Sequence, residues 1–171
     1  KVDDWVVTPR IGKPVEINAL WYNALRIMEK LHRSLGRTVV AGREEPPDFR
    51  ALAEQVYNSF RERFWYSRGN YLYDVIDGPD GPDTSLRPNQ IFALSLNNDL
   101  LSLEQSRLVL AAMRTHLLTP YGLRSLSPDD PRYIGIYTGT RTERDGAYHM
   151  GTVWAWLLGP YFDAVRAVDG P

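Results

Sequence analysis

The stretch WVVTPRIGKPVEINALWY, residues 5–22, is the segment that best predicts the fold of this chain. A loop with aromatic, arginine and carboxylate side chains leads directly into a segment that is apolar on more than one face. The same order of features returns in LYD (72–74) followed by RPNQIFAL (87–94), and in YIGIY (133–137) followed by RDGAYHMGTVW (144–154). A helix that is apolar on several sides is usually buried between neighbours. The three junctions therefore predict inner helices whose polar starts gather at one mouth of a curved helical barrel.

Two amphipathic helices separate these junctions and are predicted to lie on the outside. Asp48 is a good N-cap for a helix over 48–65, and an apolar stripe follows it at helical spacing. Ser102 and Gln105 have the spacing of a capping box, which starts a helix that ends near residue 117. The inner helices are predicted at 15–35, 89–98 and 150–168, and Pro160 is expected to kink or break the last one. Long loops are expected over 71–86 and 118–145, the second with a small β-hairpin.

The composition is that of one soluble globular domain. The 171 residues suffice for a single core, and contents of 43% hydrophobic and 24% charged residues are ordinary. The net charge of −1 gives no electrostatic basis for binding nucleic acid or an anionic membrane. No segment approaches the roughly 18 apolar residues of a membrane span. The absence of cysteine excludes disulfides and thiolate metal sites.

Four carboxylates near predicted helix starts are candidates for chemistry. Glycoside hydrolysis normally uses two carboxyl groups, and inverting enzymes hold them farther apart to admit a water molecule. Each of these carboxylates could instead stabilise the positive end of a helix. The residue types alone leave both interpretations open. The four candidates are Glu16, Asp74, Asp83 and Asp145.

Basic and aromatic residues at the same junctions could bind a sugar. Arg10 and Arg87 could donate hydrogen bonds to hydroxyl groups, or form structural ion pairs. His149 could bond a sugar hydroxyl or a carboxylate, or could be structural. His32 and His116 are placed at predicted helix ends, and no metal site is expected. Three tryptophans could stack on a pyranose ring or fill the core, namely Trp21, Trp154 and Trp156.

Four ordered motifs resemble the C-terminal catalytic domain of glycogen debranching enzymes. They are TPRIGKPVEINALWYNAL (8–25), RPNQIFALSL (87–96), LTPYGLRSL (118–126) and DGAYHMGTVW (145–154), and the resemblance covers essentially the whole chain. It implies an amylo-α-1,6-glucosidase on an (α/α)6 six-hairpin barrel. Such enzymes release glucose from α-1,6 branch points with inversion and need no cofactor. Met150 and Ala155 depart from the more usual Gln and Pro of the family, which affects fine substrate contacts.

The resemblance also implies that the catalytic acid and base lie outside this chain. The family's general acid is an Asp in a Trp-x-Asp-Ala type motif just before the Thr-Pro-Arg run. Asp3 and Asp4 lie near that place but lack the motif. The family's general base is a Glu near the end of the barrel, and we expect it to fall beyond Pro171. The chain starts at Lys1 without methionine. We therefore expect a segment of a longer protein that is inactive alone.

The combined prediction is an all-α chain that forms about half of an (α/α)6 toroid, as one domain fragment over 1–171. Its partner is expected to be a branched α-glucan such as glycogen or limit dextrin in the cytoplasm. Exposed apolar seams are expected to promote self-association. The alternatives are a trehalase- or invertase-like six-hairpin glucosidase, and a non-catalytic glucan-binding or interaction module. The predicted substrate-binding residues are Arg10, Glu16, Trp21, Asp74, Arg87, Asn89, Tyr148, His149 and Trp154.

Overall fold

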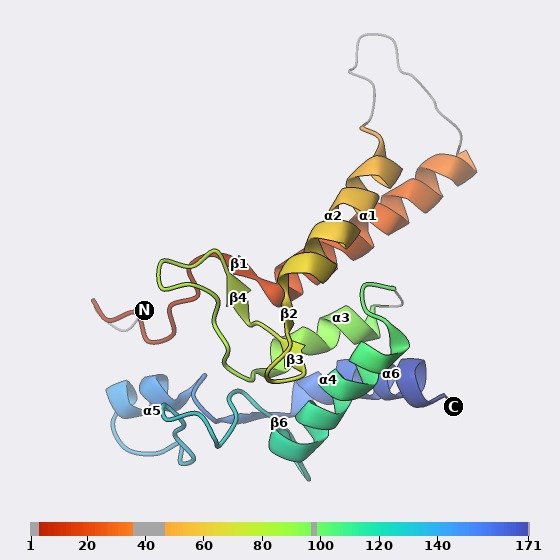
Figure 1. The fold of residues 1–171 in the computed structure, drawn as a ribbon. Coiled ribbons are helices and arrows are strands. Elements are labelled where there is room, and N and C mark those ends of the chain that lie inside the picture. Colours follow the sequence, from red (N-terminus) through yellow and green to blue (C-terminus); the bar gives the residue numbers. More distant parts are fainter. Residues whose placement is uncertain (1–3, 36–46, 97–98, 171) are drawn as a thin grey trace.

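The computed structural model describes residues 4–35, 47–96 and 99–170 of the chain (Figure 1). Within these residues the chain is predominantly helical, but strands of two or three residues form three small antiparallel sheets. The helical part of the prediction is confirmed, whereas the all-α description is too simple. Most of the strands occur where the prediction placed loops, because backbone groups that are not in a helix pair with neighbouring segments. The strand at residues 153–154 is an exception, since it lies within a predicted helix.

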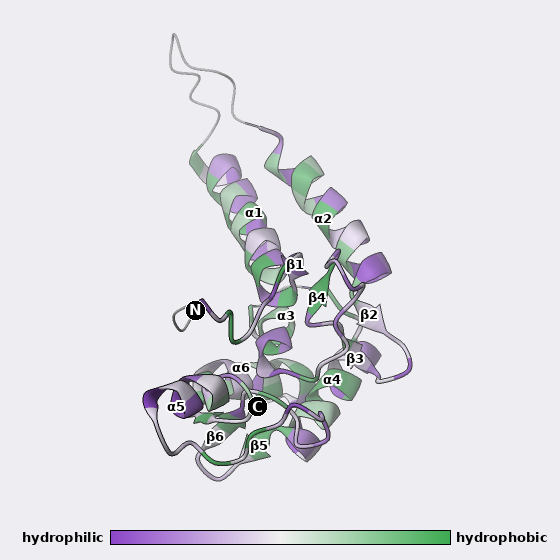
Figure 2. Ribbon diagram, turned by 90° about the vertical axis from the view of Figure 1, so that its left-hand side faces the viewer, coloured by the Kyte–Doolittle hydropathy of each residue, from purple (hydrophilic) through white to green (hydrophobic). Residues whose placement is uncertain are grey.

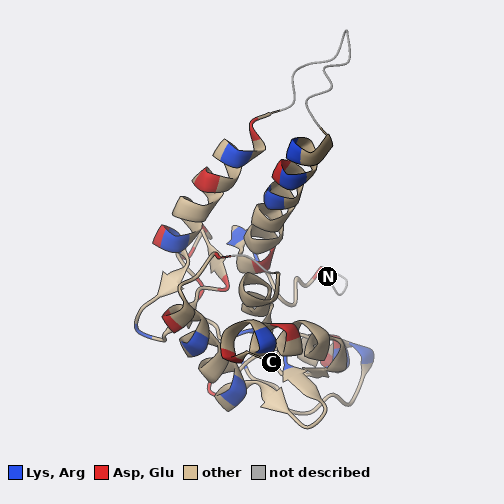
Figure 3. Ribbon diagram, turned by 90° about the vertical axis from the view of Figure 1, so that its right-hand side faces the viewer, with Lys and Arg blue, Asp and Glu red and all other residues tan. Residues whose placement is uncertain are grey.

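The helices α1 (Val15–Leu35) and α2 (Phe49–Arg63) form an antiparallel pair that projects from the rest of the molecule (Figure 1). The predicted bounds of both helices are confirmed to within two residues, and Asp48 accepts hydrogen bonds from two backbone N–H groups at the start of α2. The ring centroids of Tyr22 and Tyr57 lie 6.2 Å apart between the two helices. Charged residues of α2 lie on its outer surface, including the exposed ion pair of Arg50 and Glu54 (Figure 3).

One apolar face of α1 is buried and the opposite one is exposed, so among the described residues this predicted inner helix presents an apolar seam of the kind expected. The buried residues are Val15, Ala19, Tyr22 and Leu25. The opposite stripe is exposed because α2 covers only the first face, and Figure 2 shows apolar residues that continue along the helix. The large exposed residues of this stripe are Ile17, Leu20, Trp21, Ile27, Met28, Leu31 and Leu35.

The second half of the molecule packs around three helices. The 3-10 turn η1 (Pro88–Ile91) leads into α3 (Phe92–Ser95), so the predicted helix over 89–98 is shorter than expected, and residues 97 and 98 lie outside the described ranges. The helix α4 (Leu103–His116) starts with the predicted capping box. The helix α6 (Leu158–Asp169) contacts both α3 and α4. Buried side chains of these helices join those of α1 and α2 in one core.

The predicted helix over 150–168 is wrong in its first half. Residues 153–157 instead form β7 (Val153–Trp154) and the 3-10 turn η2 (Ala155–Leu157), and α6 follows them. The short helix α5 (Arg141–Ala147) precedes them, where the end of the loop over 118–145 was predicted. Pro160 lies in the first turn of α6, where its missing N–H is not needed. Pro160 therefore does not break or kink the helix as was expected. The helix simply starts two residues before it.

Small sheets hold the loops together. The predicted hairpin consists of β5 (Leu118–Thr119) and β6 (Gly122–Arg124), and β6 also pairs with β7. The strand β1 (Lys13–Pro14) pairs with β4 (Val75–Ile76), and β2 (Trp65–Tyr66) pairs with β3 (Tyr71–Leu72). None of the described helices is both long enough and apolar enough to cross a membrane.

Gly122 permits the close approach of β6 and β7, and alanine there should destabilise the fold. Gly122 has a φ of +148°, and a Cβ would lie 2.4 Å from the carbonyl oxygen of Trp154. We expect Gly122→Ala to lower the free energy of unfolding by about 2 kcal/mol, measured by urea denaturation. Gly159 in α6 is the matched control, because a Cβ there meets no atom within 4 Å. Gly159→Ala should leave stability unchanged or raise it, and equal losses in both variants would contradict this account.

Candidate functional site

A cavity of about 390 Å³ lies where the three predicted junctions meet. Its lining comes from the loop before α1, from η1, from the end of β6 and from the segment between α5 and α6. Segments separated by more than a hundred residues in sequence therefore share one hollow. The lining residues are Thr8, Arg10, Glu16, Arg87, Pro88, Asn89, Ser125, Tyr148, His149, Trp154, Trp156 and Leu157.

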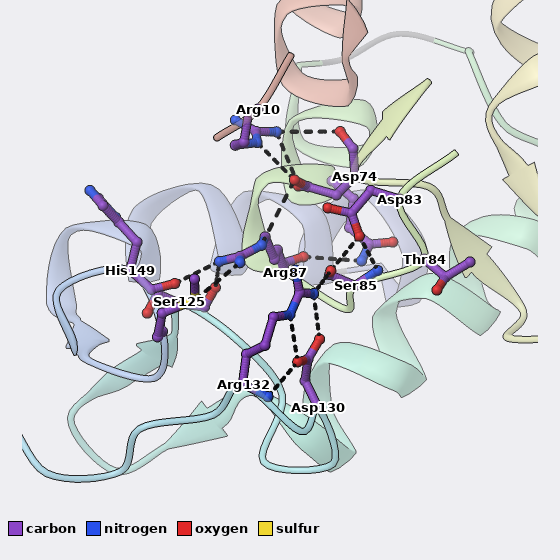
Figure 4. Close-up of polar contacts among 12 residues, drawn as sticks. Arg10, Asp74, Asp83, Thr84, Ser85, Arg87, Ser125, Asp130, Arg132 and His149 are labelled. Atoms are coloured by element: carbon purple, nitrogen blue, oxygen red, sulfur yellow. Dashed lines mark hydrogen bonds and ion pairs between the residues drawn. The ribbon is translucent and has the colours of Figure 1, made fainter. Parts of the chain in front are cut away.

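Arg10 is held between two carboxylates at one side of this cavity. Its Nε donates a hydrogen bond to Asp74 Oδ2 at 2.7 Å, and its Nη2 donates to Asp74 Oδ1 at 3.0 Å (Figure 4). The same Nη2 donates to Glu16 Oε2 at 2.7 Å, and Nη1 donates to Glu16 Oε1. Burial lowers the pKa of Arg10, but the hydrogen bonds and charges of Glu16 and Asp74 outweigh burial and raise the pKa above its usual value. Arg10 is therefore a permanent cation with both neighbours fixed in place.

The backbone explains why these residues meet although Arg10 and Asp74 are 64 positions apart. Pairing of β1 with β4 sets Pro14 opposite Val75. The backbone N–H of Val15 then donates to the carbonyl oxygen of Asp74 at 3.0 Å. Glu16 follows in the first turn of α1, so its carboxylate reaches the same guanidinium.

Arg87 connects this ion-pair cluster with the third junction. Its Nη1 donates to the carbonyl oxygens of Ser125, at 3.1 Å, and of His149, at 2.6 Å (Figure 4). Its Nη2 lies 3.5 Å from the sulfur of Met150, and its Nε lies 3.9 Å from Asp74 Oδ2. The side chain is buried, and burial lowers its pKa while the negative charge of Asp74 opposes that effect.

Asp74 is the carboxylate shared by both arginines. It is 2% exposed, and burial raises its pKa. Arg10 donates hydrogen bonds to both of its side-chain oxygens, which favours the ionised form. Removing this one charge would leave two arginines facing each other across the floor of the cavity.

Aromatic side chains form another part of the cavity wall. The ring centroid of Tyr148 lies 4.6 Å from that of Trp154 in an edge-to-face arrangement, and 4.8 Å from that of His149. Burial and then the positive charges of Arg87 and Arg10 lower the pKa of His149, so its imidazole is neutral near pH 7. The wall therefore offers ring faces together with a neutral donor and acceptor.

Seven of the nine predicted binding residues line this cavity, but Asp74 and Trp21 do not. Asp74 lies beneath it and holds Arg10. Trp21 lines a separate pocket between α1 and α2 with Lys13 and Asn18. A helix turns by about 100° per residue, so Trp21 points roughly 140° away from Glu16 around α1. The residues that line the cavity are Arg10, Glu16, Arg87, Asn89, Tyr148, His149 and Trp154.

The other two carboxylate candidates do not line the cavity. Asp83 accepts a hydrogen bond from the backbone N–H of Ser85 at 2.9 Å and borders a neighbouring pocket. Asp145 lies inside α5 and not at a helix start, and it pairs with Arg141 at 3.6 Å. Both therefore stabilise local structure. In the part of the chain that the structure describes, no group of three or more His, Cys, Asp or Glu residues is arranged to hold a metal ion.

Some lining residues were missing from the predicted set. Thr8 and Ser125 line the cavity, and both lie inside motifs that resemble the family, at 8–25 and 118–126. Their positions in these motifs could have indicated that they belong to the site. Ser125 Oγ accepts a hydrogen bond from the backbone N–H of Gly151 at 2.9 Å, which joins β6 to the third junction. Trp156 also lines the cavity, although periodicity could not separate it from a core residue.

Comparison with known proteins relates this chain to one family model and to curated relatives. The model of a family described as amylo-alpha-1,6-glucosidase matches residues 1–170 of this chain. A glycogen debranching enzyme of Saccharomyces cerevisiae is 27% identical over 188 residues, which covers 92% of this chain and 12% of that enzyme. The chain thus corresponds to a small part of the length of this relative.

Asp74→Asn should destabilise the protein strongly, because it removes the charge that Arg10 and Arg87 share without changing the size of the side chain. Breaking a buried ion pair from one side typically costs about 3 kcal/mol or more. We expect a loss of about 3 kcal/mol in the free energy of unfolding, measured by urea denaturation. Glu54→Gln breaks the exposed pair with Arg50 and should cause no measurable change. A loss for Asp74→Asn no larger than that of this control would show that the buried charge is not needed.

The pKa of His149 should lie below its ordinary value of about 6.5. The unfolded chain binds a proton at that ordinary value, whereas the folded protein binds it only at lower pH. The contribution of His149 to stability therefore falls as the pH falls through about 6.5, and it stops falling below the folded pKa. NMR titration of the imidazole measures this value, and His149→Gln assigns the signal and removes the effect. A pKa at or above that of the denatured chain would contradict the expected direction.

Proposed function

We propose a function for this chain on the basis of its family: the chain belongs to the amylo-alpha-1,6-glucosidase family. In this proposal it is a segment of a glycogen debranching enzyme. The enzyme hydrolyses α-1,6-glucosidic branch points of glycogen or limit dextrin with inversion, needs no cofactor and acts in the cytoplasm. The segment contributes part of an (α/α)6 toroid, and the exposed apolar stripe of α1 supports a position against further helices of that toroid.

The cavity at the three junctions is proposed to bind one glucose unit. The observation that carries this proposal is the convergence of ion-paired, polar and aromatic side chains from three distant segments on one hollow. A ligand site normally combines a mostly apolar wall with a few polar groups that fix orientation. The ring of Trp154 would face the apolar side of the sugar, while Asn89, Tyr148 and His149 would bond its hydroxyl groups.

The charged residues of the ion-pair cluster are proposed to shape the site and not to transfer protons. They are Arg10, Glu16, Asp74 and Arg87. A general acid or base needs a carboxyl group that is free to exchange a proton with the substrate or a water molecule. Both oxygens of Glu16 and both of Asp74 already accept hydrogen bonds from Arg10. These contacts support a binding role for this segment, with the acid and base supplied by other carboxyl groups.

Asn89→Ala should weaken hydrolysis in the complete protein that contains this chain. Loss of a hydrogen bond in a desolvated site costs about 1 to 3 kcal/mol, so kcat/KM should fall about tenfold or more. Glucose released from a limit dextrin is the measurement. Asn58→Ala is the matched control, because Asn58 is exposed on α2 and does not line the cavity. Unchanged hydrolysis in Asn89→Ala would refute the site assignment.

The same protein should be offered trehalose and sucrose beside the limit dextrin. Release of glucose from the limit dextrin alone is the expected result. Cleavage of trehalose or sucrose in its place would assign the site to another glucosidase activity. Binding of glucan without hydrolysis by the complete protein would identify a non-catalytic module.

A further inference from the structure

Trp156 is a highly exposed residue of the cavity lining, so we place it at the edge of the cavity and not in its depth. It lines the cavity, yet 62% of its surface is exposed to solvent. The ring of Phe92 stacks against it with the centroids 6.3 Å apart and the planes at 28°. One indole face is therefore supported from within the protein, and the high exposure leaves the other open to solvent.

Trp154 lies in the same segment but is less exposed than Trp156. It is only partly exposed, and its ring packs against Tyr148 at 4.6 Å and lies 6.5 Å from His149. Trp154 therefore belongs to the wall of the cavity. A ligand confined to the cavity would touch Trp154, whereas only a ligand that extends out of it would cover the free face of Trp156.

The position of Trp156 is held from both sides along the chain. Trp154 is paired with Leu123 in the sheet of β6 and β7. Leu157 is 2% exposed and anchors the end of η2 in the core. Because the residues around Trp156 are fixed, its ring is presented without a large loss of freedom on binding, which favours affinity.

An exposed tryptophan beside a polar cavity suits one kind of ligand. The face of a pyranose ring carries C–H groups and is apolar, whereas its edge carries the hydroxyl groups. A large aromatic side chain buries much apolar surface when such a face covers it. The chemistry therefore matches a second sugar ring attached to the one in the cavity.

We propose that Trp156 forms a second subsite, which binds the glucose unit from which the terminal glucose is removed. This inference rests on the proposed function, because it requires the cavity to hold the terminal unit. It goes beyond the proposed function by assigning one residue of this chain to the second glucose unit of the α-1,6-linked substrate. Trp156 then determines specificity for a linked saccharide over free glucose.

The test compares binding of glucose and of S-linked isomaltose, in which sulfur replaces the bridging oxygen so that the bond is not hydrolysed. Calorimetry with the complete protein that contains this chain gives both dissociation constants. Trp156→Ala should weaken binding of the disaccharide at least about fivefold, and it should change glucose binding less than twofold. Trp156→Phe keeps an aromatic face and should lose less.

Tyr121→Ala is the control, because Tyr121 is an aromatic residue that is 80% exposed and lies outside the cavity. It should change neither dissociation constant. If Trp156→Ala and Trp156→Phe leave disaccharide binding unchanged, or weaken glucose binding by the same factor, the second subsite is refuted while the glucose site stands. If the unaltered protein binds neither sugar, the proposed function fails and the subsite fails with it.

Discussion

The structure depends on one requirement, which is that the buried charges of Arg10, Asp74 and Arg87 be paired. A charge that is removed from water without a partner costs several kcal/mol. Asp74 is almost completely buried, and it lies between Arg10 at 2.7 Å and Arg87 at 3.9 Å. Separating the first junction from the second would remove the two hydrogen bonds that Asp74 accepts from Arg10 and would leave this buried carboxylate with only Arg87, whose Nε lies 3.9 Å away. The ion pairs therefore help to fix the relative placement of the two loops, together with the buried apolar residues of the second loop, such as Leu72 and Ile76.

The third junction is attached to the same cluster through backbone oxygens and not through a carboxylate. Arg87 donates to the carbonyl groups of Ser125 and His149, and Ser125 in turn bonds the backbone of Gly151. Backbone acceptors do not titrate, so this attachment does not depend on pH. Because they carry only partial charge, they also leave Asp74 as the main counter-ion of Arg87. The cavity thus has a rigid floor although most of its lining lies on loops.

Local signals in the sequence predicted the outer elements well, and long-range contacts account for what they missed. The caps of α2 and α4 depend on residues within three positions, so their starts were predictable. Trp21 lies apart from the other predicted binding residues, because two faces of α1 are apolar and the sequence does not specify which of them turns toward the cavity. Residues 153–154 pair with β6 although their spacing fits a helix. The role of Asp74 depends on Arg10, 64 positions away, and no local pattern specifies such a pair.

The charge balance of the site also bears on what it can bind. Arg10 and Arg87 contribute two positive charges, and Glu16 and Asp74 contribute two negative ones, so the cluster is neutral as a whole. His149 adds no charge near neutral pH, because burial and the two arginines disfavour its protonation. A phosphate or a carboxylate ligand would need an uncompensated cation, and the arginines here are already paired. A neutral polyhydroxylated ligand needs only oriented donors, acceptors and ring faces, so the balance of charges favours a sugar over an anion of similar size.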